Sequence, residues 1–233
     1  MKQELKGTGL IRGTATGKVR IIDCSRPKFE IHKIDDTDRE LGRFIRALKT
    51  YCDNTRDRIE LIKRTMGRRE AEILNTHIKM THDLAIRSEL ITKISGGMCA
   101  EQALSEVCES YINRFLDADA EFVRRLAIDV MDVETCIMNL LLGKKDVAVE
   151  HFDEDTVVVT NEITPSVIAR LDRLHTKAIV VGRGSKHSHS AHLVKAIKII
   201  GVHNIENVAS LLHNGETVVV NGSAGTVKVV AYT

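Results

Sequence analysis

The sequence contains no tryptophan, has only 3% aromatic residues and carries almost no net charge. Its 34 basic residues stand against 32 acidic ones, which leaves a formal charge of +2 over 233 residues. Proteins that bind nucleic acid usually present a basic surface to the phosphates and aromatic side chains to the bases. We therefore expect no nucleic-acid partner.

Long apolar runs and paired cysteines are missing as well. No apolar stretch approaches the roughly 18 residues that span a bilayer, and the amino terminus lacks the apolar core of a signal peptide. The five cysteines are scattered and form no C-x-x-C pair, so they do not indicate a metal or redox site. Single thiols are typical of a reducing compartment, and we expect a cytoplasmic protein without a membrane contact.

A central helical region is predicted from the spacing of the apolar residues. Thr37 followed by Glu40 is a capping-box pattern that indicates where the first helix begins. Apolar residues then recur at helical spacing in four segments, which we expect to be residues 37–66, 70–93, 99–115 and 119–142. Gly143 follows as a plausible helix C-cap.

β-Strand patterns flank this region on both sides. Residues 9–23 indicate strand, turn and strand, and residues 216–232 indicate a second hairpin. Between them lie a β-branched run at 156–160, a helix start at Thr164 and Pro165, and an apolar strand at 178–181, listed here in chain order. The sequence thus predicts an α/β domain formed by residues 1–34 and 144–233, interrupted by an all-helical subdomain of residues 35–143.

The segment VGRGSKHSHSAH, residues 181–192, is the strongest candidate for chemistry. It has three histidines in a glycine- and serine-rich loop between a buried strand and an amphipathic helix. Free N–H groups at a helix amino terminus suit a phosphoryl group held on an imidazole. A neutral imidazole is the nucleophile in such chemistry, while serine hydroxyls and basic side chains contact the phosphoryl oxygens.

Two other interpretations of this loop stay open. It could be a solvated polar segment whose histidines have no role. It could also be a zinc site formed by His187, His189 and His192, because three imidazoles suffice for an open zinc position. No cysteine, aspartate or glutamate lies nearby to complete it, so we assign no metal ligand.

The chain resembles the amino-terminal domain of Enzyme I of the bacterial phosphoenolpyruvate-dependent sugar phosphotransferase system. The resemblance covers nearly the whole chain and includes GTGLIRGTATGKVRI, AEILNTHIKMTHD, RRLAIDVMDVETCIMNLL, NEITPS, VVGRGSKHSHS, IIGVHN and HNGETVVVNGSAGTVKVV. It implies a swivelling phosphohistidine α/β domain interrupted by a helical subdomain that binds the phosphocarrier HPr. In that family a loop histidine takes a phosphoryl group from phosphoenolpyruvate and passes it to a histidine of HPr.

The resemblance implies His189 as the phosphorylated residue, with His187 as the alternative. The local match is Ser188-His189-Ser190, which requires a short insertion and an equal deletion. Counting back from Gly201 without gaps instead places Lys186 at the position that the active histidine occupies in the family. A domain of the same fold that has lost the reaction, and acts only in partner binding or regulation, is therefore the alternative function.

Other implied residues are those that contact the phosphoryl group or the partner. The phosphate-stabilising candidates are Arg183, Ser188, Ser190, Lys195, which falls where the family has an arginine, and Thr164, which matches a threonine that hydrogen-bonds the active histidine. Thr164 is equally compatible with being only a helix cap.

A docking surface for HPr is implied by the segment HIKMTHD. Its expected contact residues are His77, Met80 and Asp83. The family has acidic residues just downstream, whereas here Leu84 and Ala85 follow Asp83, so attraction to a basic carrier should be weaker.

The sequence therefore predicts a phosphotransferase that does not use phosphoenolpyruvate unaided. The resemblance places phosphoenolpyruvate and magnesium in a separate carboxy-terminal barrel, so no cofactor is expected in this chain. The expected partners are an HPr-like phosphocarrier and that barrel, if the native chain continues past residue 233.

Overall fold

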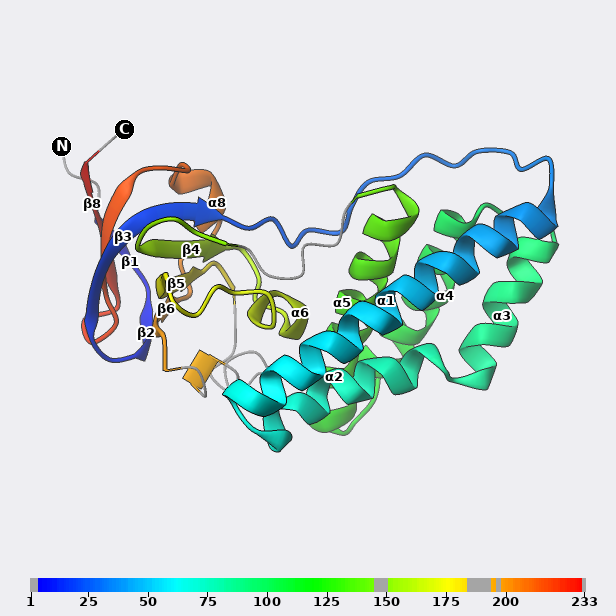
Figure 1. Cartoon of the computed structure of the whole chain (residues 1–233), viewed down its shortest axis with the longest axis horizontal. Coiled ribbons are helices and arrows are strands. Elements are labelled where there is room, and N and C mark those ends of the chain that lie inside the picture. The colour runs from blue at the N-terminus through cyan, green and yellow to red at the C-terminus, as the bar shows by residue number, and fades with distance from the viewer. Residues whose placement is uncertain (1–3, 145–150, 184–193, 196–197, 232–233) are drawn as a thin grey trace. The chain divides into compact units, whose positions relative to one another are not determined.

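The computed structural model describes residues 4–144, 151–183, 194–195 and 198–231 (Figure 1). The chain divides into two compact units, one formed by Met1–Ser25 with Val149–Thr233 and the other by Arg26–Ala148. The first unit contains the β-sheet, and the second is helical. Within the described residues, no helix combines the length and apolar character needed to cross a membrane.

Among the described residues, the sheet unit consists of one eight-stranded sheet with two short helices. Its strands are β1 (Glu4–Lys6), β2 (Thr8–Ile11), β3 (Thr14–Ile21), β4 (Thr156–Thr160), β5 (Thr176–Val181), β6 (Ile200–His203), β7 (Thr217–Asn221) and β8 (Thr226–Ala231). The helices are α6 (Pro165–Ile168) and α8 (Val208–Leu211). The strand order is β1-β8-β7-β3-β4-β5-β6-β2.

Strands β3, β4, β5 and β6 are parallel, and the remaining neighbours are antiparallel. All five residues of β4 are buried, which matches its continuous run of β-branched residues. In the register, Val157 of β4 lies between Val19 of β3 and Ala178 of β5, and all three are buried. The predicted α/β class and its strand-rich ends are thus confirmed.

Strands β1 and β2 lie at opposite ends of the strand order although only Gly7 separates them in the chain. Gly7 donates its N–H to the carbonyl of Gly225 at 2.8 Å, and a Cβ on Gly7 would lie 2.4 Å from the carbonyl oxygen of His203. One segment therefore pairs with β8 on one side and β6 on the other, and only glycine fits at its midpoint.

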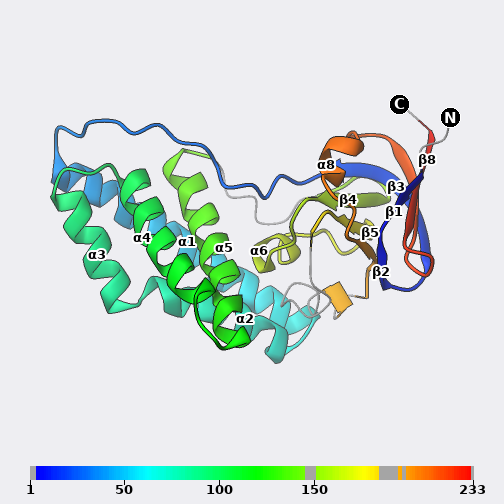
Figure 2. The same cartoon turned by 180° about the vertical axis from the view of Figure 1, so that it is seen from behind.

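The helical unit is built from five helices. They are α1 (Thr37–Thr65), α2 (Arg68–Thr81), α3 (Leu84–Ser95), α4 (Ala100–Leu116) and α5 (Glu121–Leu141). Helix α1 lies nearest the viewer in Figure 1, and the view from behind in Figure 2 presents α4 and α5. Their apolar faces form one buried cluster that includes Phe44, Tyr51, Leu104, Ile137 and Met138.

The helical unit begins at Arg26, before residue 35, which was its predicted start. Phe29 packs against the helical core, and the guanidinium of Arg26 donates two hydrogen bonds to the carboxylate of Glu134. The Glu134 side chain is fully buried, and this desolvation raises its pKa despite the hydrogen bonds from Arg26. The segment before α1 has no helical periodicity, but its contacts with the helices extend this unit to Arg26.

Helix α1 begins at Thr37, as predicted, but its N-cap is Asp36, whose carboxylate accepts a hydrogen bond from the Arg39 N–H. The next helix was predicted wrongly. The helix expected over 70–93 is broken after Thr81, because Asp83 accepts hydrogen bonds from two N–H groups at the start of α3. An aspartate in a capping position starts a new helix even where the apolar spacing continues.

Asp172 organises the turn that leads into β5. Burial works to raise the pKa of its carboxyl, but hydrogen bonds from the His175 ring and from the N–H groups of Leu174, Phe152 and His175 lower that pKa from 3.8 to about 2. A carboxylate with a lowered pKa stabilises the fold above its ordinary pKa and loses this effect as the pH falls.

We predict that Asp172→Asn lowers the free energy of unfolding by a constant amount above pH 5 or so, because asparagine cannot titrate. The difference from the wild type should shrink as the pH falls from 3.8 towards about 2. Urea unfolding at a series of pH values measures it. A difference that is the same at both ends of this window would contradict the assignment.

Candidate functional site

The carboxyl ends of β4 and β5 bring two chain turns together. These strands are parallel neighbours, so their carboxyl ends lie at the same edge of the sheet, where α/β folds place ligands. Gly182, after β5, donates its N–H to the carbonyl of Thr160 at 2.9 Å, and Arg183 donates to that of Asn161 at 2.8 Å. The start of the histidine loop is therefore fixed against the turn that follows β4.

A pocket of about 200 Å³ lies at this edge. Its lining residues are polar apart from one glycine: Asn161, Glu162, Gly182, Arg183 and Asn207. A Cβ on Gly182 would lie 3.0 Å from both the Cα and the carbonyl oxygen of Asn161, so a larger residue would push the two turns apart. Glycine at this position keeps the pocket and its two walls in place.

Arg183 supplies positive charge to the pocket. Its guanidinium lies 3.5 Å from the Glu206 carboxylate, and the two side chains are 69% and 75% exposed. An ion pair so open to water contributes little and does not hold the guanidinium in one geometry. Arg183 can therefore turn its hydrogen-bond donors to an incoming anion, as expected for a phosphate-stabilising residue.

Asn161 and Asn207 shape the opposite wall. The side-chain oxygen of Asn161 accepts a hydrogen bond from the Ala209 N–H at 3.2 Å, which ties the turn after β4 to α8. Asn207 has a left-handed backbone with φ of 53° at the start of α8, a conformation that asparagine tolerates better than most residues. Neither residue was among the predicted site residues; their position directly after or near a buried strand was the available signal.

Thr164 is the N-cap of α6. Its hydroxyl accepts a hydrogen bond from the Val167 N–H at 3.4 Å and lies 3.2 Å from the hydroxyl of Ser166. Pro165 occupies the first helical position, as predicted. The capping role of Thr164 is thus confirmed, and its expected bond to a loop histidine stays a prediction.

The histidine loop itself falls outside the described residues. His187, Ser188, His189, Ser190 and His192 all belong to this part of the chain. Lys195 is described and is exposed, next to the buried Val194. Of the predicted phosphate-stabilising residues, only Arg183 is a described residue of the pocket lining.

His77 lies inside the helical unit and has no exposed surface. Its Nε2 is 3.3 Å from a carboxylate oxygen of Asp129, and its Nδ1 is 3.9 Å from one of Asp132, so the ring joins α2 to α5. The expectation that His77 touches a docked partner is corrected on this ground, because a fully buried ring cannot reach one. The face of α2 that packs against α5 includes this polar residue.

Met80 and Asp83 lie at the end of α2 and the start of α3. Met80 is partly buried and packs against the helical core, whereas Asp83 is exposed and caps α3. Leu84, next to this cap, is 83% exposed. The exposed surface at the α2–α3 junction therefore combines the apolar Leu84 with Asp83 and with the exposed Lys79 and His82.

Two family models match successive parts of the chain. The one described as PEP-utilising enzyme, N-terminal, matches residues 6–125, and the one described as PEP-utilising enzyme, mobile domain, matches residues 152–225. The solved structure of Enzyme I (nEIt) is similar with a TM-score of 0.80 and 25% identity, covering 97% of this chain and 92% of that one. That of the N-terminal domain of Enzyme 1 - Nitrogen has a TM-score of 0.68 at 21% identity and shows the fold alone.

A sheet unit interrupted by a helical unit is thus the architecture of Enzyme I amino-terminal domains. The chain belongs to the PEP-utilising enzyme, N-terminal, family.

Curated relatives carry the description phosphoenolpyruvate-protein phosphotransferase. The protein of Bacillus subtilis (strain 168) is 29% identical over 230 residues, and that of Lactococcus lactis subsp. lactis (strain IL1403) is 30% identical over 233 residues. Each match covers 97% of this chain but only 40% of the relative. The chain therefore spans less than half the length of the phosphotransferases that it matches.

Proposed function

We propose that this chain is the phosphohistidine-bearing part of a phosphoenolpyruvate-protein phosphotransferase. His189, or His187 in the alternative register, accepts a phosphoryl group derived from phosphoenolpyruvate and passes it to a histidine of an HPr-like phosphocarrier. The observation that carries the proposal is the pocket at the carboxyl ends of β4 and β5, where the histidine loop begins beside Arg183.

The chemistry requires a neutral imidazole and a place for the phosphoryl oxygens. A ring nitrogen with a lone pair attacks phosphorus, an N–P bond forms, and the P–O bond to the enol oxygen breaks. In the second step the partner's imidazole attacks, and the first N–P bond breaks. Both steps depend on positioning and on charge neutralisation. The exposed guanidinium of Arg183 can neutralise charge on the phosphoryl oxygens.

Binding of the phosphocarrier is assigned to the α2–α3 junction. Its exposed Leu84 offers an apolar contact beside the charged Asp83, and Met80 supports them from the core side. The exposed Lys79 and His82 lie in the same segment, so electrostatic attraction to a basic carrier should be weak.

Phosphoenolpyruvate and magnesium belong, in this proposal, to a separate carboxy-terminal barrel, as the family resemblance implies. The proposed location is the cytoplasm, since all five cysteines are free thiols, four of them buried.

Incubation of the chain with phosphorylated HPr tests the relay. We expect an acid-labile gain of one phosphoryl group on the peptide that contains residues 184–193, detected by mass spectrometry under neutral conditions. The same peptide should stay unlabelled with free phosphoenolpyruvate, because the chain alone lacks the phosphoenolpyruvate site in this proposal. Absence of any label from phosphorylated HPr would favour the alternative, a domain of the same fold that only binds partners.

A further inference from the structure

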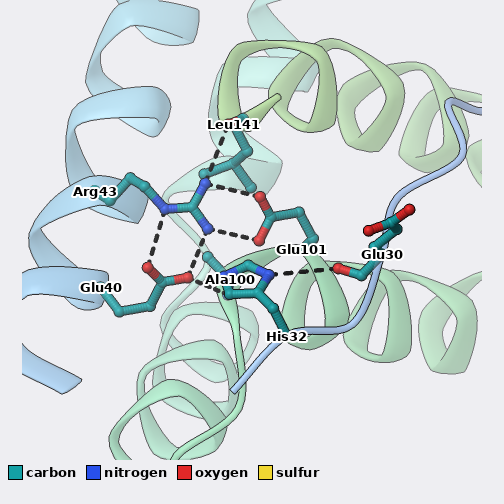
Figure 3. A network of polar contacts seen from close by, with 7 residues as sticks. All are labelled: Glu30, His32, Glu40, Arg43, Ala100, Glu101 and Leu141. Carbon is teal, nitrogen blue, oxygen red and sulfur yellow. Dashed lines mark hydrogen bonds and ion pairs between the residues drawn. The ribbon is translucent and has the colours of Figure 1, made fainter. Parts of the chain in front are cut away.

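A charged network joins α1, α4 and α5 in the helical unit (Figure 3). The Arg43 guanidinium donates to both oxygens of Glu101, at 2.7 and 2.6 Å, and also to both oxygens of Glu40, at 3.0 and 2.6 Å. The two carboxylate side chains are only 9% and 5% exposed. When the nearby His32 is neutral, two carboxylates against one guanidinium leave one negative charge in a mostly buried place.

His32 and Cys99 lie beside this network. One ligand atom from each of His32, Cys99 and Glu101 lies within 4.8 Å of the other two. Cys99 is 1% exposed and occupies the N-cap position of α4 without capping it. Among the described residues its thiol has no hydrogen-bond partner, so a buried polar atom points into the cluster unused.

The ring of His32 is exposed, and one of its nitrogens faces a backbone carbonyl. Its Nδ1 lies 3.4 Å from the backbone carbonyl oxygen of Glu30, a contact drawn in Figure 3. With the proton on Nδ1, the lone pair of the ring is on Nε2. Metal-ligating histidines commonly donate their other ring N–H to such a carbonyl, and ligating carboxylates are themselves hydrogen-bonded, as Glu101 is by Arg43.

We propose that His32, Cys99 and Glu101 bind one zinc ion, with water as the fourth ligand. Nitrogen and thiolate ligands select zinc over magnesium or calcium. Binding releases the thiol proton of Cys99, so the ion and the thiolate together add one positive charge, which balances the network. With zinc–ligand bonds of roughly 2.0–2.3 Å in a tetrahedral site, the ligand atoms must move to within about 3.5 Å of one another.

The ion would act as a clip within the helical unit. His32 belongs to the segment between Arg26 and Asp36 that leads into α1, whereas Cys99 and Glu101 lie at the start of α4. This role does not depend on the histidine loop or on phosphoryl transfer. Each proposal can therefore fail without the other.

Cobalt substitution of the tag-free, reduced and metal-stripped full chain tests the site. We expect one cobalt ion per chain with a thiolate-to-cobalt charge-transfer absorption, and displacement of that band by one equivalent of zinc. Zinc, but not magnesium, should raise the midpoint of thermal unfolding. Cobalt bound without a thiolate band would overturn the proposal.

Single variants separate the ligands from the fold. Cys99→Ser should abolish the band and the zinc-dependent rise in the midpoint while leaving metal-free stability unchanged or higher, because serine is a good N-cap. His32→Ala should weaken zinc binding by at least about 100-fold, since loss of a second-shell partner alone costs roughly 10–100-fold. His151→Ala, an exposed histidine of the sheet unit, is the matched control and should change neither. A thiolate band that survives Cys99→Ser would refute the site.

Discussion

Replacing His189 with alanine should reduce the transfer of phosphoryl groups from phosphorylated HPr to background. The imidazole is the nucleophile of the proposed relay, and no hydroxyl in the loop can replace its lone pair at neutral pH. The measurement is acid-labile phosphorylation of the loop peptide, followed by mass spectrometry, in wild type and variant side by side. The expected loss is complete because, if His189 is the phosphorylated residue, no other group carries the covalent intermediate.

His187→Ala is the matched control for this experiment, because it removes a second imidazole two residues away in the same loop. It should retain most of the labelling. The reverse pattern would identify His187 as the phosphorylated residue and the other register as correct. Equal labelling of both variants and the wild type would place the phosphoryl group outside these two residues and contradict the proposed site.

Arg43→Met should destabilise the chain by about 3–5 kcal/mol in the presence of a metal chelator, because it leaves two buried carboxylates without their common partner. Glu40 also accepts a hydrogen bond from the Ala100 N–H at the start of α4, so the lost charge pairing weakens the α1–α4 contact directly. Urea unfolding at pH 7 measures the difference.

Arg56→Met is the control on the same helix. Arg56 pairs with Asp53 on the surface, where both side chains are about half exposed, and such a pair contributes at most about 1 kcal/mol. A loss from Arg43→Met no larger than that from Arg56→Met would contradict the importance of the network.

The effect of Arg43→Met should also depend on pH. The hydrogen bond from Arg43 lowers the pKa of Glu40 below 4.5, so the carboxylate stabilises the wild type above this value and loses that effect as the pH falls through its folded pKa. In the variant, protonation of Glu40 removes an unpaired buried charge and so stabilises the fold. The difference between the two proteins should therefore be largest near neutral pH and decrease below pH 4.5.

Periodicity predicted the long helices well but not the break between α2 and α3. The runs that became α1, α4 and α5 were found because apolar residues repeat over many turns. A single hydrogen-bonding side chain decides a boundary, which is why Asp83 starts α3 inside the helix that was expected over residues 70–93. β1, with three residues, is too short to show a pattern.

The site was less accessible to sequence reasoning than the fold. Arg183 could be expected at the pocket because it directly follows a buried strand, but the role of His77 required knowledge of which face of α2 meets α5. The cluster of His32, Cys99 and Glu101 joins residues from a connecting segment and a distant helix, and no local spacing marks it. Tertiary packing alone brings such groups together.

The glycine-bent amino-terminal segment has a consequence for any shortened version of this protein. Its first half covers the outer side of β8, and its second half covers the outer side of β6. Cutting the chain before Thr14 would strip both flanks of the sheet in one step and leave two rows of unpaired backbone groups ready to pair with other molecules. We therefore expect a chain shortened in this way to self-associate, whereas the full sheet leaves neither β8 nor β6 unpaired on that side.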